Sequence, residues 1–150
     1  FLIDVLKGSV PLLLVQKYFP GDDALVAVVG VFLVFGHCYT PYLKLKGGKG
    51  VATGFGVLLV ALPWAALFSG VVYIALLLTT RISAVGSLGG MVTTVIYLFV
   101  AKPEQWRLVL VVCVAFIVLV RHREHVVRLL RSSKTKKSSA LTAKPPIRVA

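Results

Sequence analysis

Acidic residues and cysteines are both scarce in this sequence. Its 150 residues include 5 Asp or Glu and 2 Cys. Cys38 and Cys113 lie far apart and have no metal-ligand spacing, which excludes a disulfide framework and a cysteine-based metal centre. No Ser-His-Asp set, paired catalytic carboxylates or His/Cys/Asp/Glu cluster is present either. The sequence therefore predicts neither a metal site nor a cofactor.

Apolar residues, in contrast, dominate the composition. They make up 58% of the chain, and the mean hydropathy is +0.93, far above an ordinary soluble domain. Basic residues supply 17 of the charged side chains, for a net charge of +12. In a membrane protein such an excess indicates cytoplasmic loops rather than nucleic-acid binding. We therefore expect an all-α, polytopic membrane bundle surrounded by lipid, with no nucleic-acid partner.

Six apolar runs are candidate membrane spans, although several are short for a typical bilayer. They are Leu2–Tyr18, Ala24–Cys38, Val51–Leu62, Trp64–Thr79, Ile82–Val100 and Trp106–Val120. Basic residues flank the stretch 51–79 at both ends, so we predict a hairpin that turns near Pro63 and keeps them on one side. The six crossings then place 14 basic residues on one face and 3 on the other. The positive-inside rule makes the first face cytoplasmic.

The sequence changes character after Val120. The stretch "RHREHVVRLL" (121–130) alternates basic and apolar residues and predicts a short amphipathic helix at the membrane interface. Residues 131–150 are basic and rich in Ser, Thr and Pro, which is typical of a disordered tail attracted to anionic lipid. We therefore divide the chain into a membrane domain at 1–130 and a cytoplasmic tail at 131–150.

A glycine-rich and lysine-rich loop joins the second and third apolar runs. Glycines beside lysines indicate phosphate binding, because backbone N–H groups can approach the anion while lysine supplies charge. The nucleotide P-loop pattern fails, since Leu43 replaces its first glycine and Gly50 replaces its Ser or Thr. What remains is another kind of phosphate site. It would comprise Gly47, Gly48, Gly50, Lys46 and Lys49, with a helix N-terminus beginning at Val51.

Two histidines and two arginines flank this loop in the predicted topology. His37 and His122 lie at cytoplasmic helix ends, together with Arg81 and Arg123. Such a cluster can bind phosphate and move protons. Alternatively, the lysines only anchor helix ends and the histidines are interfacial side chains. Four glycines between residues 47 and 54 favour the phosphate site, because an anchor does not need residues that are entropically costly to order.

These residues resemble the bacterial acyl-phosphate:glycerol-3-phosphate acyltransferases of the PlsY type. "GHCYTPYLKLKGGKGVATGFG" (36–56) is similar to that family's glycerol-phosphate loop, G-H-x-x-P-x-x-x-x-F-K-G-G-K-G-V-A-T. "DVLKGSVP" (4–11) resembles the helix after its first motif, and "RHREHVVRLL" resembles its H-R-x-N-I-x-R-L-L segment. Arg81 with Ser87 resembles an R-x-x-S-x-x-S element. The resemblance runs in order from Asp4 to Leu130.

The resemblance implies a membrane enzyme of the bacterial inner membrane, with seven helices in the complete family and six here. Its cytoplasmic site would transfer an acyl chain from acyl phosphate to the 1-hydroxyl of glycerol-3-phosphate, giving lysophosphatidic acid and phosphate for phospholipid synthesis. The implied catalytic residues are His122, Arg81 and Ser87. The implied substrate-binding residues are His37, Lys46, Gly47, Gly48, Lys49, Gly50, Thr53 and Arg123. The activated mixed anhydride would explain why no enzyme nucleophile is present.

The sequence departs from the family pattern in several places. A first helix and a serine-bearing first motif would precede Phe1, and we expect that both are missing from this chain. Four positions carry a different residue from the family pattern. The family has Asn at the position of His125, Gly at Ser132 and Glu at Lys134, and it has the first Ser of the R-x-x-S-x-x-S element at Ala84.

Two other functions remain open. One is a non-enzymatic membrane protein that binds anionic lipid or phosphate through residues 44–50 and the basic tail. The other is an organic-phosphate transporter, which is disfavoured because the basic residues lie at one membrane face rather than near the midplane. A monomer is compatible with the small-residue spacing of 83–90, which serves packing within a chain as well as between chains.

Overall fold

The computed structural model describes residues 1–40 and 47–142, with side chains through Arg123. The described residues form six α-helices and no strand, which confirms the all-α prediction. The helices are α1 (Leu2–Tyr18), α2 (Asp23–Cys38), α3 (Val51–Ala61), α4 (Pro63–Thr80), α5 (Ser83–Ala101) and α6 (Gln105–Thr142). Except at the end of α6, these bounds agree with the predicted runs to within one residue at each end.

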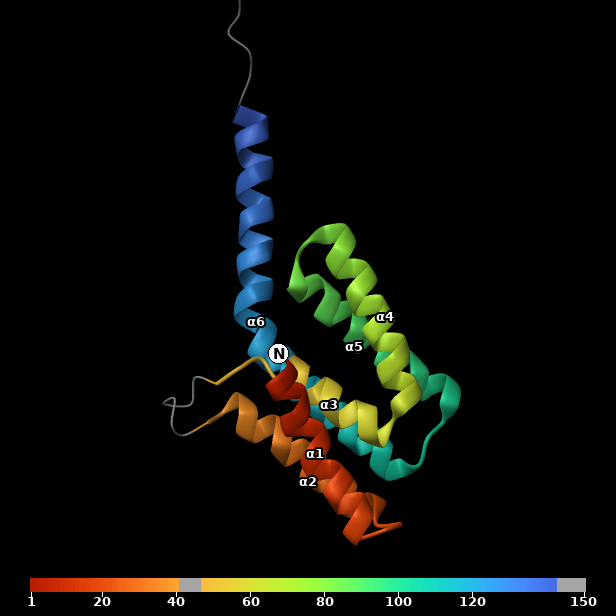
Figure 1. Ribbon diagram of the computed structural model, residues 1–150. Helices are drawn as coiled ribbons and strands as arrows, with labels where there is room; N and C mark the ends of the chain where they lie inside the picture. Colours follow the sequence, from red (N-terminus) through yellow and green to blue (C-terminus); the bar gives the residue numbers. More distant parts are fainter. Residues whose placement is uncertain (41–46, 143–150) are drawn as a thin grey trace, which may run out of the picture.

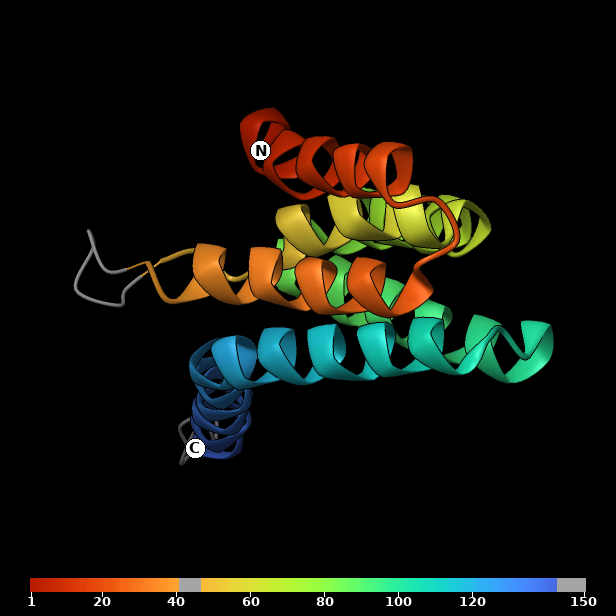
Figure 2. The ribbon, with the colours of Figure 1, turned by 90° about the horizontal axis from the view of Figure 1, so that it is seen from below.

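The helices form a bundle with most of its connections at two ends. Helices α1, α2, α3 and the first half of α6 lie side by side, and α4 and α5 form a hairpin beside them (Figures 1 and 2). The N-terminus, the connection between α2 and α3 and the bend of α6 lie at one end, which we call the loop end. The α1–α2 and α5–α6 turns lie at the other.

Three helices are long and apolar enough to cross a membrane, by the length and composition of the described residues. They are α4, α5 and the Gln105–Arg123 part of α6, whereas α2 and α3 are shorter apolar helices. Their outer faces carry exposed aromatic and aliphatic side chains, with Phe99 79% and Val100 78% exposed. Lipid rather than water suits these faces. That α1, α2 and α3 also each cross the membrane stays a prediction.

The predicted hairpin near Pro63 is confirmed. Helix α3 ends at Ala61 and α4 begins at Pro63, leaving Leu62 alone between them. Proline suits the first position of a helix because it lacks the N–H that would have no intrahelical partner there. Leu62 is buried and packs with Ala65, so the turn closes against the bundle.

The C-terminal prediction needs correction. The sequence predicts that the apolar helix ends near Val120, followed by a short helix over 121–130 and a disordered tail from 131. Instead α6 continues without interruption to Thr142. The segment 131–142 contains no Gly or Pro, and its Lys, Ala and Leu residues favour helix. Residues 143–150 lie outside the described part of the chain.

Helix α6 is nevertheless not straight. Figures 1 and 2 show that it bends after its apolar first half, so that its second half leaves the bundle. Just after that first half, Nδ1 of His122 lies 3.0 Å from the carbonyl oxygen of Val118, one turn earlier. A side chain that bonds to a carbonyl of the helical ladder is a recognised cause of helix bending, because it competes with the backbone N–H.

At the end opposite the loop end, charged side chains join two turns. The guanidinium of Arg107 lies 3.6 Å from the carboxylate of Asp23, while Asp22 accepts a hydrogen bond from the Leu25 N–H and caps α2. Hydrogen bonding to Asp23 and its negative charge raise the pKa of Glu104. These contacts connect the start of α2 to the start of α6.

Glycines allow the closest helix contacts in the core. A Cβ on Gly8 of α1 would collide with the carbonyl oxygen of Thr53 in α3, and one on Gly56 of α3 would collide with the carbonyl oxygen of Val5 in α1. The two backbones therefore touch at both positions, as in small-residue packing of membrane helices.

We expect Gly56→Ala to destabilise the bundle by about 1–3 kcal/mol, because the new methyl group must push α1 and α3 apart. The measurement is thermal unfolding in detergent. Gly36→Ala is the matched control, since nothing lies within 4 Å of a Cβ there and alanine favours the helix. Equal melting temperatures for the two variants would contradict the close-contact interpretation.

Candidate functional site

The stretch Gly47–Gly50, here called the glycine segment, leads directly into α3. Gly50 has φ +80°, a left-handed conformation that glycine adopts without strain, and its carbonyl accepts the first helical hydrogen bond from the N–H of Gly54 at 2.7 Å. The first N–H groups of a helix have no partner within it, and the helix dipole makes them attractive to anions. Their direction suits a phosphate group at the loop end.

Arg121 of α6 holds the glycine segment in place. Its Nη2 donates to the carbonyl oxygen of Gly47 at 2.8 Å and its Nε to that of Gly48 at 3.3 Å. The guanidinium also lies 5.3 Å from the ring centroid of Tyr39, within range for a cation–π contact. Sequence reasoning missed Arg121. Its only signal was its place directly before His122 in "RHREHVVRLL".

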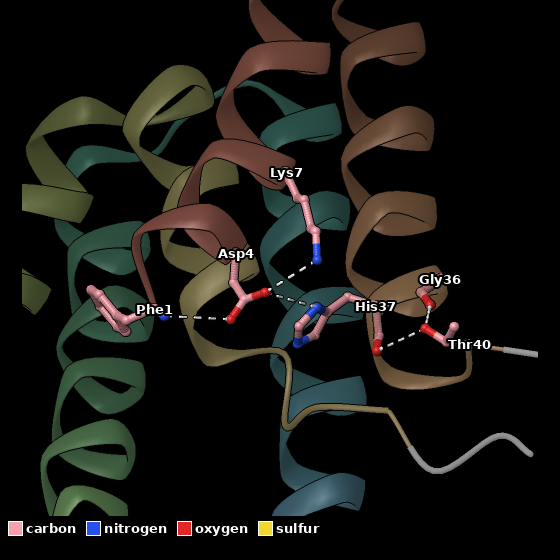
Figure 3. Close-up of polar contacts among 6 residues, drawn as sticks. All are labelled: Phe1, Asp4, Lys7, Gly36, His37 and Thr40. Atoms are coloured by element: carbon pink, nitrogen blue, oxygen red, sulfur yellow. Dashed lines mark hydrogen bonds and ion pairs between the residues drawn. The ribbon is translucent and has the colours of Figure 1, made fainter. Parts of the chain in front are cut away.

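His37 packs against the same segment from the end of α2. A Cβ on Gly48 would collide with the His37 imidazole, and the Gly48 N–H donates to the His37 carbonyl at 3.2 Å. Figure 3 shows the imidazole pointing toward α1, where the Asp4 carboxylate faces both His37 and Lys7. The Asp4 carboxylate lies 3.8 Å from Nδ1 of His37 and 3.5 Å from Nζ of Lys7. Asp4 is thus well placed to orient the imidazole that covers Gly48.

His122 lies in α6, one turn after a residue that is close to the glycine segment. Its side chain is only 1% exposed, and a Cβ on Gly50 would contact Val118, one turn before His122. Because a carbonyl oxygen only accepts, the contact with the Val118 carbonyl requires the proton on Nδ1. In the neutral form this leaves Nε2 as the acceptor nitrogen of the ring.

A narrow apolar cleft of about 240 Å³ begins beside the glycine segment. Phe1 and helices α3, α4, α5 and α6 line it. Most of the lining residues in the four helices can be grouped into three layers, ordered from the loop end along the helix axes. The mouth layer, at the loop end, contains Val51, Tyr73, Ser87 and Val118. The middle layer contains Phe55, Gly70, Met91 and Ala115, and the far layer contains Leu58, Ser69, Thr94 and Val111.

The few hydroxyl groups in the cleft are already hydrogen-bonded: those of Ser and Thr within their own helices, and that of Tyr73 in α4 with the Ser83 hydroxyl of α5 at 3.1 Å. Ser87 donates to the Ser83 carbonyl at 2.9 Å, Thr94 to the Gly90 carbonyl at 3.0 Å and Ser69 to the Ala66 carbonyl at 3.1 Å. A satisfied hydroxyl presents little demand for water. The cleft therefore suits a hydrocarbon occupant.

The structure shows fewer contacts between the remaining predicted site residues and the glycine segment. Thr53 is fully buried, and its hydroxyl has no hydrogen-bond partner among the described residues. Lys49 and Arg123 are exposed near the loop end. Arg81 is exposed at the end of α4 with φ 57°, and in the described part of the chain no bond joins it to the glycine segment.

Some predicted positions lie beyond what the structure describes. Lys46 is outside the described residues, and the side chains of His125, Ser132 and Lys134 are outside them too. Among the described residues, no group of three His, Cys, Asp or Glu side chains could hold a metal ion.

Comparison with known proteins decides the family. The family model described as "Glycerol-3-phosphate acyltransferase" matches residues 1–132. The chain belongs to the glycerol-3-phosphate acyltransferase family. The chain is 39% identical over 140 residues to a glycerol-3-phosphate acyltransferase of an Anaeromyxobacter strain, covering 89% of this chain and 68% of the relative. A relative from Aquifex aeolicus is 35% identical over 130 residues, with 87% and 68% covered.

Solved structures of the family show the same arrangement of helices. Two crystal structures of PlsY, an integral membrane glycerol 3-phosphate acyltransferase, match with TM-score 0.81 and 34% identity. One is the glycerol 3-phosphate form and the other the lysophosphatidic acid form. The match covers 87% of this chain and 66% or 67% of theirs. This chain therefore spans about two thirds of its relatives' length and shares the membrane-bundle fold of the family.

We expect Arg121→Gln to loosen the glycine segment, because hydrogen bonds to a charged group contribute about 1.5–3 kcal/mol each. Amide hydrogen exchange across residues 47–53, measured by mass spectrometry in detergent, should speed up by about tenfold or more. Arg123→Gln is the control, since Arg123 is exposed and close in sequence. Unchanged exchange in Arg121→Gln would refute the holding role.

Proposed function

We propose that this chain forms the larger part of an enzyme that transfers an acyl group from acyl phosphate to the 1-hydroxyl of glycerol-3-phosphate. One observation carries the proposal: the anion-binding start of α3 and the mouth of the apolar cleft lie together at the loop end. Val51, the first residue of α3, and Val118, one turn before His122, both line that mouth. A phosphate site beside a hydrocarbon site suits substrates that carry one group of each kind.

In this proposal the glycine segment and Lys49 bind the phosphate of glycerol-3-phosphate. Lys46 and Arg123 add positive charge, and His37 keeps Gly48 in place. Thr53 supports the segment from within α3, where its side chain is buried. The printed names of the relatives support this assignment, because they are glycerol-3-phosphate acyltransferases and one solved relative is described in its glycerol 3-phosphate form.

The proposed chemistry needs no covalent enzyme intermediate. The 1-hydroxyl oxygen attacks the acyl carbonyl carbon, a new ester C–O bond forms, and the C–O bond to the phosphate group breaks. The phosphate leaves with the bonding electrons. His122 accepts the hydroxyl proton at Nε2 and passes it to the departing phosphate, which balances charge and protons. Arg81 and Ser87 stabilise the negative charge that develops on the donor.

We place the loop end on the cytoplasmic face of the bacterial inner membrane, together with the tail at 131–150. The support is the charge distribution of the sequence, with 14 basic residues on the side of the glycine segment and 3 on the other. Both phosphorylated substrates are water-soluble at their reacting ends, so a site at the membrane surface suits them.

The donor is tested with the full-length protein in detergent, radiolabelled glycerol-3-phosphate, and either palmitoyl phosphate or palmitoyl-CoA. We expect lysophosphatidic acid from palmitoyl phosphate only. Product from palmitoyl-CoA alone would overturn the donor assignment. No product from either donor, in folded protein, would favour the non-enzymatic membrane protein that binds anionic lipid or phosphate.

We expect Lys49→Ala and Gly48→Leu to raise the KM for glycerol-3-phosphate by about tenfold or more, since each removes a charge or closes the phosphate site. The Gly48 variant also displaces His37, whose ring occupies the space of any side chain there. Steady-state kinetics at saturating donor measures the effect. Lys17→Ala, in the last turn of α1 at the opposite end, should leave the KM unchanged. Wild-type KM in both site variants would remove the glycine segment from the proposal.

A further inference from the structure

The far end of the apolar cleft is closed by a buried cluster. Val111 of the far layer is 3% exposed and packs with Leu62, Ala65 and Leu98, which are all 7% exposed or less. Leu58, also in the far layer, packs against the same cluster. The cluster lies at the α3–α4 turn and the adjoining helices, so the cleft does not continue through the bundle.

The depth of the cleft follows from helix geometry. Three helices each line it over a span of seven residue-to-residue steps: Val51 to Leu58 in α3, Ser87 to Thr94 in α5 and Val111 to Val118 in α6. At about 1.5 Å of rise per residue, this corresponds to roughly 10 Å. That depth is about a third of the ~30 Å hydrocarbon core, so a long acyl chain cannot extend fully inside.

We propose that the far layer of Leu58, Thr94 and Val111 ends the acyl-binding cleft and thereby sets which acyl-chain length is transferred best. The inference rests on the proposed acyl transfer. A chain that reaches this layer fills the cleft and gains the full burial of apolar surface. A longer chain must bend out toward lipid, where each further methylene adds no binding free energy from contact with the protein.

Two further positions control the volume between the mouth and the far layer. Ala115 of α6 and Met91 of α5 both line the middle layer and are half-buried. A larger side chain at 115 would stop the acyl chain one layer earlier. A smaller residue at 111 would open the closed end.

The experiment compares kcat/KM for octanoyl, lauroyl and palmitoyl phosphate in the full-length wild type and two variants. Ala115→Phe should reduce the palmitoyl to octanoyl ratio by about tenfold or more, the size expected when a pocket loses room for methylene groups. Val111→Ala should raise the same ratio. Thermal unfolding of each variant checks folding, and Ala115→Phe carries the test if Val111→Ala fails to fold.

Val112→Phe is the matched control, because Val112 adjoins Val111 but is 57% exposed on the outer face of α6. Its ratio should equal that of the wild type. The proposal is overturned if Ala115→Phe lowers all three rates equally, if the ratio does not change, or if Val112→Phe shifts it as much. A wild type that transfers from no donor would instead refute acyl transfer itself, and the length proposal with it.

Discussion

The site depends on the hydrogen bonds between Arg121 and the carbonyls of Gly47 and Gly48. An irregular backbone at the edge of a membrane bundle needs partners for its polar groups, because lipid supplies none. Arg121 supplies them from α6, which is far away in sequence. By binding the carbonyls on one side, it fixes the peptide planes and thus the direction of the amides that lead into α3. Tyr39 stacks on the same guanidinium and adds α2 to the assembly.

Glycine serves two different purposes around this interaction. At Gly50 it permits the left-handed turn from which α3 starts. At Gly48 it leaves the space that the His37 imidazole occupies. The Asp4 carboxylate lies near that imidazole, so three helices and one loop converge on a few backbone atoms. This convergence links the packing of α1 and α2 to the geometry of the proposed anion site.

Much of the fold could be predicted from sequence because its signals are local. Apolar runs gave the helices, and the flanking charges together with Pro63 gave the α3–α4 hairpin. Glycines beside lysines predict an anion site at the start of α3, and this site stays a prediction. Arg121 and Asp4 could not be predicted in the same way, since their partners are backbone and side-chain atoms brought near by folding. The sequence predicts too short an α6, because a polar, basic composition is typical of disorder, yet the helix contains no Gly or Pro before its end at Thr142.

The cleft also depends on packing that no single segment reveals. Its Ser and Thr residues appear polar in sequence, yet each bonds to a carbonyl of its own helix, which leaves a largely apolar lining. The family resemblance implies a catalytic role for Ser87, and in the structure this residue lines the apolar cleft and bonds to the Ser83 carbonyl.

Helices α4 and α5 touch through glycines, since a Cβ on Gly86 would contact the Tyr73 carbonyl and one on Gly90 the Ser69 carbonyl. Because their backbones are in contact, α4 and α5 have little room to shift relative to each other, so the hairpin forms one stiff wall of the cleft. The outward side of this wall carries exposed apolar residues such as Val71 and Ile74. Any separation of this wall from the rest of the bundle would therefore move the hairpin as a unit. In the proposed reaction, the single-chain lipid product would then pass sideways into the leaflet, without its hydrocarbon tail entering water.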